Sequence, residues 1–257
     1  MRFNQIKLIV CFLAIMFSPA ISFGADNRQL FEKANALYAK NQYKQAADIY
    51  NEILKAGYQS AALYFNLGNA HYKQGEVPEA ILYYEKAHRL APGDDDINFN
   101  IRLANSKTVD KIDEVPEFFL SRWWNGFILS FSADKLATTA IIFMLIGSAF
   151  LIWYFFAIAG GVKKFAFFSS VVFFFVAIGA VVIATSQLSY FDNNKQGIVF
   201  TPSVNVKTSP ADAVSTAFVL HEGTKVNVLG SNGGGWLKIK LANGNEGWIK
   251  AADVKEI

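Results

Sequence analysis

The side chains that could carry covalent or metal chemistry are few and scattered in this chain. Its single cysteine, Cys11, allows no internal disulfide and no cysteine-based metal cluster. The three histidines, His71, His88 and His221, lie far apart in sequence, and none has a second histidine or a carboxylate at the spacing of a zinc protease. We find no nucleophile–base pair and no phosphate-binding loop in the sequence. We therefore expect a protein that is not an enzyme and that holds no metal or cofactor.

Amide groups and aromatic rings are the side chains with the better spacing for binding. Between residues 31 and 100, one set of positions interleaves Phe31, Phe65, Phe99, Tyr38 and Tyr72 with Asn. This combination suits an extended peptide, because an Asn amide can both donate to and accept from a peptide backbone. The net charge of +3, without a basic stripe, gives no indication of nucleic acid binding.

A repeat of 34 residues positions these side chains. Tyr72 and Tyr84 each follow another tyrosine by 34 residues, and Ala80 follows another alanine by the same interval. Gly68 follows Ala34, which is also small. A period of this length with small residues at fixed places indicates helix pairs stacked as a solenoid.

The repeating segment resembles the tetratricopeptide repeat. Residues 61–92, AALYFNLGNAHYKQGEVPEAILYYEKAHRLAP, match nearly the whole signature of that family. Residues 27–58 match it less closely and end in Tyr58, where the family has Pro. Residues 94–112 look like the first helix of a third repeat. This helix begins with acidic residues, which favour a helix N-terminus.

The resemblance implies that ligands lie in a concave groove lined by the first helix of each repeat. The matching positions are Phe31, Asn35, Tyr38, Phe65, Asn66, Asn69, Tyr72, Phe99 and Asn100. Asn35 and Asn69 are the better binding candidates, since a buried core rarely holds an unpaired amide. The alternative is that the aromatic rings only pack between repeats. One subclass clamps a C-terminal carboxylate with cations, but those places here hold Phe31, Asp96 and Asn100, so we expect no such clamp.

Two long apolar runs predict a membrane hairpin. Residues 137–159 and 165–188 carry no charge, and each is long enough to cross ~30 Å of hydrocarbon at ~1.5 Å per residue. The absence of ionisable side chains in the runs favours an anchor over a transporter. Trp123 and Trp124 precede the hairpin and fit the aromatic belt of a membrane interface. The alternative is that residues 118–132 pack as an aromatic cluster on the repeats.

The charged linker and the N-terminus predict the orientation of this hairpin. The linker GGVKK (160–164) is short and positive, and such loops stay in the cytoplasm. Residues 1–24 have the positive start, the short apolar core and the small terminal residues of a cleaved secretory signal, with an uncleaved anchor as the alternative. Both features place the repeats and the C-terminal segment outside, in a periplasm. Positive residues on that side (Lys111, Arg122 and Lys135) argue the other way, and we give the export signal more weight.

The C-terminal residues 196–257 change to short β-rich runs, separated by the turn sequences NGGG and ANGN. We expect five short strands in a small barrel. The segment resembles the bacterial SH3 domain at 204–210, 218–230, 235–249 and 254–257. The resemblance implies binding of cell-wall peptide or of another protein, with Trp236 and Lys207 on the binding surface. Lys207 stands where the family has Arg, which weakens bidentate pairing, and Trp248 is expected in the core.

The predicted fold class is a multidomain chain with an all-α tetratricopeptide solenoid, a two-helix transmembrane hairpin and a small all-β SH3-like barrel. Its order is a signal peptide (1–24), repeats with a capping helix (25–112), a linker with an interfacial aromatic segment (113–135), the hairpin (136–190) and the barrel (196–257). This order resembles the BatE-type proteins of the bacterial aerotolerance operon. The resemblance implies membrane-bound von Willebrand A-type partners and a role in envelope integrity or oxidative-stress tolerance.

We therefore expect a two-pass adaptor of the bacterial inner membrane with both folded modules in the periplasm. The repeats would bind partner proteins, and the barrel would bind peptidoglycan peptide or a second protein. The alternative is a sensor of envelope stress. A sensor needs a cytoplasmic output, and only the linker at 160–164 is available for one.

Overall fold

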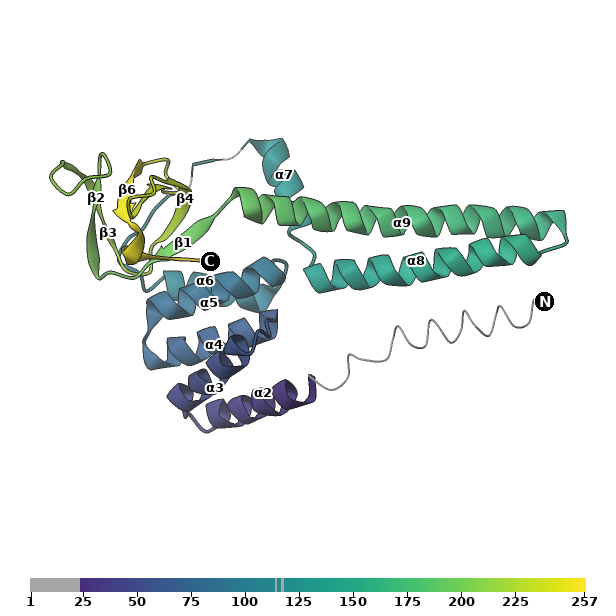
Figure 1. Ribbon diagram of the computed structural model, residues 1–257, viewed down its shortest axis with the longest axis horizontal. Coiled ribbons are helices and arrows are strands. Elements are labelled where there is room, and N and C mark those ends of the chain that lie inside the picture. The colour runs from purple at the N-terminus through teal and green to yellow at the C-terminus, as the bar shows by residue number, and fades with distance from the viewer. Residues whose placement is uncertain (1–23, 114, 117) are drawn as a thin grey trace.

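The computed structural model describes residues 24–113, 115–116 and 118–257. Apart from Gly24, the signal predicted at 1–24 lies outside these residues. The described chain forms a helical repeat region, a short helix, a long helical hairpin and an antiparallel sheet, in the order expected from the sequence (Figure 1).

The repeat region consists of helices stacked in pairs. Its elements are α2 (Gly24–Ala39), α3 (Tyr43–Lys55), α4 (Ala61–Gln74), α5 (Val77–Leu90) and α6 (Asp95–Asn105). Ser60 caps α4 by accepting from the backbone of Leu63. Gly75 ends the same helix in the left-handed conformation. Asp94 caps α6, as its acidic start predicted.

Small residues let these helices approach each other closely. Gly68 on α4 faces the ring of Tyr84 on α5, and a Cβ at Gly68 would lie 2.7 Å from that ring. Tyr84 is fully buried, and so is its counterpart Tyr50 one repeat earlier. The pairing of a small residue with a large ring at a fixed interval therefore forms the core of the repeats.

The hairpin consists of α8 (Ala133–Phe156) and α9 (Gly160–Asn193). Both helices are apolar and long enough to cross a membrane. The connection differs from the expected one, because residues 160–164 form the first turn of α9 and only residues 157–159 lie between the helices. Gly147 on α8 contacts the ring of Phe174 on α9, so the two helices pack through a small residue.

The C-terminal sheet has seven strands in the described residues rather than five. They are β1 (Gln196–Val199), β2 (Ser203–Lys207), β3 (Thr216–His221), β4 (Lys225–Ser231), β5 (Trp236–Lys240), β6 (Glu246–Lys250) and β7 (Val254–Glu256). Their order is β3-β2-β6-β5-β4-β1-β7. The run 218–230 yields two strands because it turns at Gly223, whose φ of 83° favours glycine. Alternate residues such as Leu237, Ile239 and Ile249 fill the interior.

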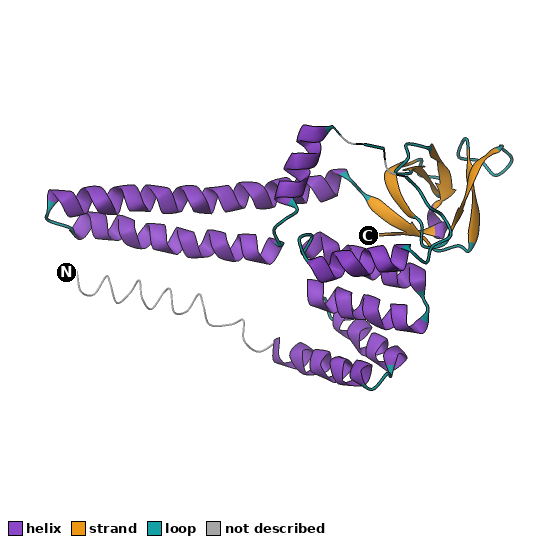
Figure 2. Cartoon of the chain, turned by 180° about the vertical axis from the view of Figure 1, so that it is seen from behind, coloured by secondary structure: helices purple, strands orange, loops and turns teal. Residues whose placement is uncertain are grey.

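The repeat region and the barrel formed by this sheet lie at the same end of the hairpin (Figures 1 and 2). Helix α9 leads almost directly into β1. Strand β1 in turn packs on the repeats, because Ile198 joins one apolar cluster with Ile81 and Tyr84 of α5. The two modules thus share a core contact although the hairpin separates them in sequence.

Candidate functional site

One cavity of roughly 160 Å³ opens on the first helices of the repeats. It is lined by Asn35, Tyr38, Tyr50, Asn66 and Asn69. Four of these residues belong to the groove expected from the sequence, and the structure brings them together from two helices, α2 and α4. Tyr50, on α3, is the lining residue that the sequence reasoning did not include in the groove.

Hydrogen bonds give the asparagines of the cavity a structural role. The Tyr50 hydroxyl donates to Asn35 Oδ1 at 2.6 Å, and one repeat later the Tyr84 hydroxyl donates to Asn69 Oδ1 at 2.8 Å. Asn66 Nδ2 donates to Asn35 Oδ1 at 3.0 Å. The amide oxygens of Asn35 and Asn69 therefore satisfy buried hydroxyl groups that the core would otherwise leave unpaired.

The same network leaves polar groups open for a ligand. Within the described residues, Nδ2 of Asn35, Nδ2 of Asn69 and Oδ1 of Asn66 have no hydrogen-bond partner. The cavity thus offers two amide donors and one acceptor, which match the carbonyl and N–H groups of an extended peptide.

The tyrosine hydroxyls that hold these asparagines remain protonated over the whole physiological range. Burial raises the pKa of Tyr50 to about 12. Burial also raises the pKa of Tyr84, whose side chain is fully enclosed. A protonated hydroxyl donates its hydrogen to the amide oxygen, so the NH₂ group of each asparagine is directed elsewhere.

The remaining residues of the expected groove lie outside this cavity. The rings of Phe31 and Phe65 each pack 5.8 Å from a buried tyrosine ring, as expected if aromatic residues fill the space between repeats. Tyr72 lies under the ammonium of Lys107, with 4.5 Å from Nζ to the ring centroid. Phe99 on α6 is 56% exposed.

Asn100 is engaged by its own helix. Its Nδ2 donates to the backbone oxygen of Asp96, four residues earlier in α6, at 2.9 Å. Within the expected groove, the structure thus separates a polar cavity on α2 and α4 from residues that pack or bond locally.

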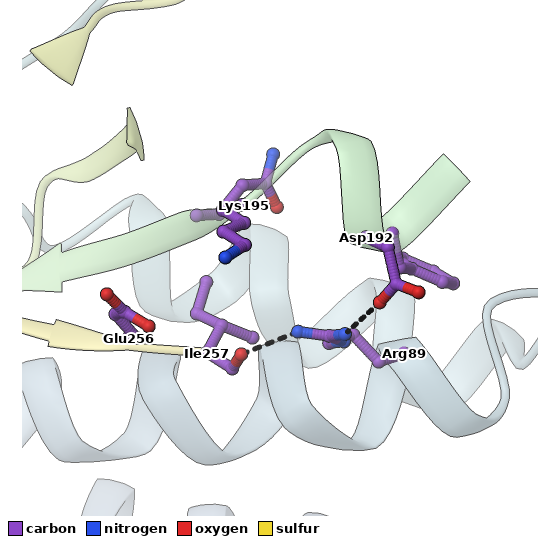
Figure 3. A pocket seen from close by; sticks show the side chains of 7 residues that line it. Arg89, Asp192, Lys195, Glu256 and Ile257 are labelled. Carbon is purple, nitrogen blue, oxygen red and sulfur yellow. Dashed lines mark hydrogen bonds and ion pairs between the residues drawn. The ribbon is translucent and has the colours of Figure 1, made fainter. Parts of the chain in front are cut away.

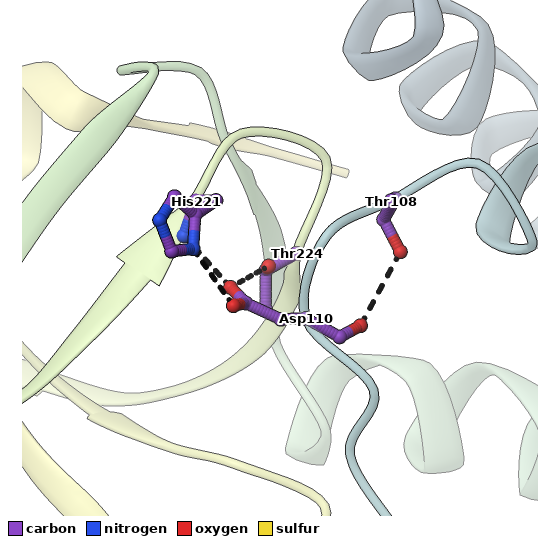
Figure 4. Close-up of polar contacts among 4 residues, drawn as sticks. All are labelled: Thr108, Asp110, His221 and Thr224. Atoms are coloured by element: carbon purple, nitrogen blue, oxygen red, sulfur yellow. Dashed lines mark hydrogen bonds and ion pairs between the residues drawn. The ribbon is translucent and has the colours of Figure 1, made fainter.

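A second polar cluster joins the repeat region to the barrel. Asp110, just after α6, accepts hydrogen bonds from the backbone N–H of His221 at 2.7 Å and from the Thr224 hydroxyl at 2.7 Å (Figure 4). Its other carboxylate oxygen lies 2.9 Å from Nδ1 of His221. Burial alone would raise the pKa of Asp110, but the hydrogen bonds from Thr224 and His221 outweigh it and hold the pKa below its usual value.

Two cation contacts complete this joint. The buried carboxylate of Glu85 on α5 pairs with Lys225 at the start of β4, with 2.8 Å between Nζ and Oε1. Arg89 donates to the main-chain oxygen of Ile257 at 2.6 Å, and its guanidinium lies 4.0 Å from Asp192 at the end of α9 (Figure 3). Arg89 therefore touches all three parts of the molecule: the repeats, the hairpin and the barrel.

The exposed face of the barrel combines tryptophan with lysine. Trp236 and Lys250 are paired across β5 and β6, and Nζ of Lys250 lies 5.6 Å from the Trp236 ring centroid. Trp248 is paired with Lys207 on one side and with Lys238 on the other. Both tryptophans are half-buried and alternate with buried residues along their strands, so Trp248 does not lie in the core as the sequence analysis expected.

Lys207 is less free than the sequence suggested. Its Nζ donates to the backbone oxygen of Val214 at 3.2 Å and to the Thr216 hydroxyl at 3.4 Å. Lys207 thus holds the β2–β3 loop. Sequence reasoning missed two further cations on this face, Lys238 and Lys250, which pair at 2.8 Å with Glu246 and Asp212 respectively. Their positions in strands next to Trp236 and Trp248 were the available signal.

Comparison with known families agrees with this geometry. Residues 31–95 match the tetratricopeptide repeat, and residues 202–255 match the bacterial SH3 domain. The chain carries both modules. Each is a binding module rather than a catalytic one, and together they indicate protein binding and cell-wall-related binding. No curated protein matches the chain.

A short helix, α7 (Phe119–Ile128), lies between the tetratricopeptide repeats and the hairpin. It packs on α9 through Ile128, which is buried, while Trp123 is 66% exposed and Trp124 is 42% exposed. Gln187 of α9 is buried as well, and its Nε2 donates to the backbone oxygens of Ile128 and Phe131 at 3.0 and 2.9 Å. The expected aromatic segment is thus held against the hairpin with its tryptophans outward.

Proposed function

We propose that this protein is a membrane-anchored adaptor of the bacterial envelope. The observation that carries the proposal is the polar joint between the two binding modules, made by Asp110, by the pair of Glu85 with Lys225, and by Arg89. Because the joint fixes the repeats and the SH3 domain to one another, the two modules present their ligands at a set spacing. The hairpin then holds this pair of modules at a membrane surface.

The proposed orientation places both modules outside, in the periplasm of the inner membrane. Lys163 and Lys164 lie in the first turn of α9, at the end of the hairpin away from the modules. Positive residues beside short loops favour the cytoplasmic side. Because the modules lie at the opposite end, they would face outward, which agrees with the secretory signal expected at 1–24.

Each module would contribute one ligand. The cavity with the open amide groups of Asn35, Asn66 and Asn69 would bind an extended segment of a partner protein, through its backbone. The face with Trp236 and Trp248 would bind peptidoglycan peptide or a second protein. Held on one surface, each bound ligand raises the effective concentration of the other without any new contact.

The resemblance to BatE-type proteins supports membrane-bound von Willebrand A-type proteins as the partners. It also supports a role in envelope integrity or oxidative-stress tolerance. In that setting the adaptor would connect a partner complex in the membrane with the cell wall above it.

The test is a crosslinking pull-down of the tagged full-length chain from native membranes, followed by mass spectrometry of proteins and wall fragments. Asn66→Ala is the most informative change in the cavity, because Asn35 Oδ1 keeps its bond from Tyr50 when Asn66 is lost. Asn100→Ala is the matched control, since that amide is bonded within its own helix and lies outside the cavity.

Loss of the protein partner with Asn66→Ala, but not with Asn100→Ala, would support binding in the cavity. Equal capture by both variants would rule the cavity out as the partner site. Recovery of wall fragments that disappears with Trp236→Ala would support the role of the SH3 domain. If the wild-type chain recovers neither a protein nor a wall fragment, the adaptor proposal fails.

An envelope sensor is the second candidate, and the continuity of α9 favours it. This helix runs for 34 residues from the turn with Lys163 to the strand that packs on the repeats. A helix of that length spans ~51 Å at ~1.5 Å per residue, so it could transmit a movement across a bilayer. A kink introduced by Gly179→Pro should abolish signalling through α9 but leave partner capture by an adaptor unchanged.

A further inference from the structure

We propose that α7 lies in the lipid headgroup layer and inserts its aromatic face into the leaflet from which α9 emerges. The partner of this surface is thus the bilayer itself, at its interface. This inference rests on the proposed membrane anchoring. It adds a third attachment, beside α8 and α9, that fixes how the two modules stand on the membrane.

The residues of α7 divide into two faces. Phe119, Trp123 and Phe127 recur at intervals of four and therefore lie on one side of the helix. Their exposed fractions are 66%, 66% and 40%. Ser121 and Asn125 occupy the other side. A short helix with large apolar rings on one face and polar groups on the other lies in the plane of a membrane interface.

The rings on the apolar face support one another. The rings of Trp123 and Phe127 are stacked with 6.2 Å between centroids, and Trp124 lies 6.0 Å from the same Phe127 ring. Phe131, just beyond the helix, contacts Phe127 edge-on at 5.5 Å. Tryptophan is the residue that favours the headgroup level, because its ring is apolar while its N–H seeks a polar partner.

Gln187 fixes the height of α7 along the hairpin. Its Nε2 donates to the backbone oxygens of Ile128 and Phe131, at the end of α7, where helix carbonyls have no partner within the helix. Gln187 also lies at the end of the apolar run 165–188, where the hydrocarbon layer should end. The end of α7 is thereby held at the level where a headgroup layer begins.

The exposed apolar surface of α9 begins at the level of Gln187 and continues along the hairpin. Leu188, the neighbour of Gln187, is 61% exposed on α9, and further along the same helix Val182 and Ile178 are 50% and 58% exposed. Helix α7 crosses the direction of the hairpin rather than continuing it (Figures 1 and 2). If α8 and α9 cross the bilayer, α7 therefore runs along its surface. Ser121, Asn125 and Ile128 line a cavity shared with the end of α9, so the rings of Phe119 and Trp123 lie on the side of α7 away from that helix.

The experiment measures the depth of single labelled cysteines in the full-length chain. The background carries Cys11→Ser, and the chain is reconstituted in vesicles of phosphatidylcholine and phosphatidylglycerol with or without bromine-labelled lipids. An environment-sensitive fluorophore is placed by Phe119→Cys or Leu120→Cys on the aromatic face, and by Ser121→Cys on the polar face. A label at Ile152→Cys, four residues before the end of α8 and within the apolar run 137–159, is 58% exposed and reports on membrane anchoring.

The proposal expects blue-shifted emission at positions 119 and 120 and loss of that emission with lipids brominated near the headgroup. The label at position 121 should keep its emission. Gln187→Leu should reduce the quenching at position 119 and leave the label at position 152 unchanged, because only the fixed height of α7 is lost.

The outcomes separate this inference from the proposed function. If the label at position 152 is not quenched by deeply brominated lipids, the proposed anchoring fails. If position 152 is quenched but positions 119 and 120 behave like position 121, the inference on α7 is overturned and the anchoring stands. A blue shift at position 119 without quenching would mean that a protein surface covers α7, and it would equally overturn the proposal.

Discussion

The joint between the two modules and the contact within the hairpin differ in the side chains that form them: the joint is polar, and the hairpin contact is apolar. The joint uses a buried carboxylate with a lysine, a second carboxylate with three hydrogen bonds, and an arginine. The hairpin uses small residues against aromatic rings, such as Gly147 against Phe174. Charged groups lose less solvation in a module that borders water than in lipid, where helices associate by close packing instead.

The two contacts should therefore open under different conditions. A polar joint responds to pH and to the loss of one partner in a pair. A packed hairpin responds to side-chain volume. Gln187 combines features of the polar joint and the packed hairpin, because it is a polar group buried at the end of the apolar run.

The strongest way to break the joint is Lys225→Ala. The side chain of Glu85 is only 4% exposed, so loss of its cation leaves a buried charge without this partner. We expect the free energy of unfolding to fall by about 3–5 kcal/mol, as for one broken partner of a buried pair. Thermal unfolding of the detergent-purified chain measures this.

Lys240→Ala is the matched control for that change. Lys240 is 45% exposed and lies 3.8 Å from an exposed Glu246. Its loss should cost less than about 1 kcal/mol. Equal effects of the two substitutions would mean that burial of Glu85 does not control the joint.

Asp110→Ala should weaken the joint by about 1.5–3 kcal/mol, because the N–H of His221 and the hydroxyl of Thr224 lose a charged acceptor. Hydrogen exchange at His221 and in the segment before α7 measures the opening. Asp113→Ala, at an exposed position nearby, should leave exchange unchanged. Slow exchange at His221 in Asp110→Ala would contradict the role of this carboxylate.

The joint should also loosen in acid. Because the folded state holds the pKa of Asp110 below its usual value, the stabilisation is complete above the unfolded pKa of about 3.9. It is lost as the pH falls through the lower, folded pKa. The protection factor of the His221 amide, which is its exchange rate relative to the intrinsic rate at the same pH, should therefore fall below about pH 4 in the wild type, with a weaker pH dependence in Asp110→Asn. An identical pH profile for both would reject this linkage.

Gly147→Leu tests the hairpin by volume. A Cβ at this position would lie 2.9 Å from the ring of Phe174, so the larger side chain forces the helices apart. We expect a loss of about 1–3 kcal/mol in the detergent-purified chain. Gly179→Leu is the control, because its Cβ would meet no atom within 4 Å. A larger loss for Gly179→Leu would mean that α8 and α9 pack through another face.

The smallest effect separates the two asparagines of the cavity. Asn69→Ala removes the acceptor of the fully buried Tyr84 hydroxyl and should cost on the order of 1 kcal/mol. Asn35→Ala should cost less, because Tyr50 lines the cavity and water can take the place of the amide. Adding Tyr84→Phe to Asn69→Ala should recover most of the loss. If Tyr84→Phe recovers none of the lost stability, the hydrogen bond from the Tyr84 hydroxyl to Asn69 is not the cause of the loss.

Much of the fold follows from local patterns in the sequence. The interval of 34 residues predicts the helix pairs, the uncharged runs predict the long helices, and the alternation around Trp236 and Trp248 predicts strands. Local patterns fail at boundaries. Gly160 and Gly161 read as a linker, yet they begin α9, because an apolar helix on a packed partner tolerates glycine in its first turn.

The candidate site was predictable only in part. The resemblance to the tetratricopeptide repeat implied one groove with Asn35, Tyr38, Asn66 and Asn69, and the structure assembles these residues around one cavity. Their hydrogen bonds to Tyr50 and Tyr84 depend on how the second helix of each repeat packs, which the residue pattern does not specify. From the sequence, Asn35 and Asn69 are therefore expected to be free to bind a ligand, whereas in the structure their amide oxygens accept hydrogen bonds from buried tyrosines.

The modules can be recognised from the sequence, since each is defined by a periodicity that local burial imposes on the chain. How the modules meet becomes visible in the folded molecule alone. Asp110 and His221 are separated by 111 residues, and Glu85 and Lys225 by 140, with the hairpin between them. No periodicity links such positions, because contacts between modules depend on the shape and charge of surfaces that form only when each module has folded.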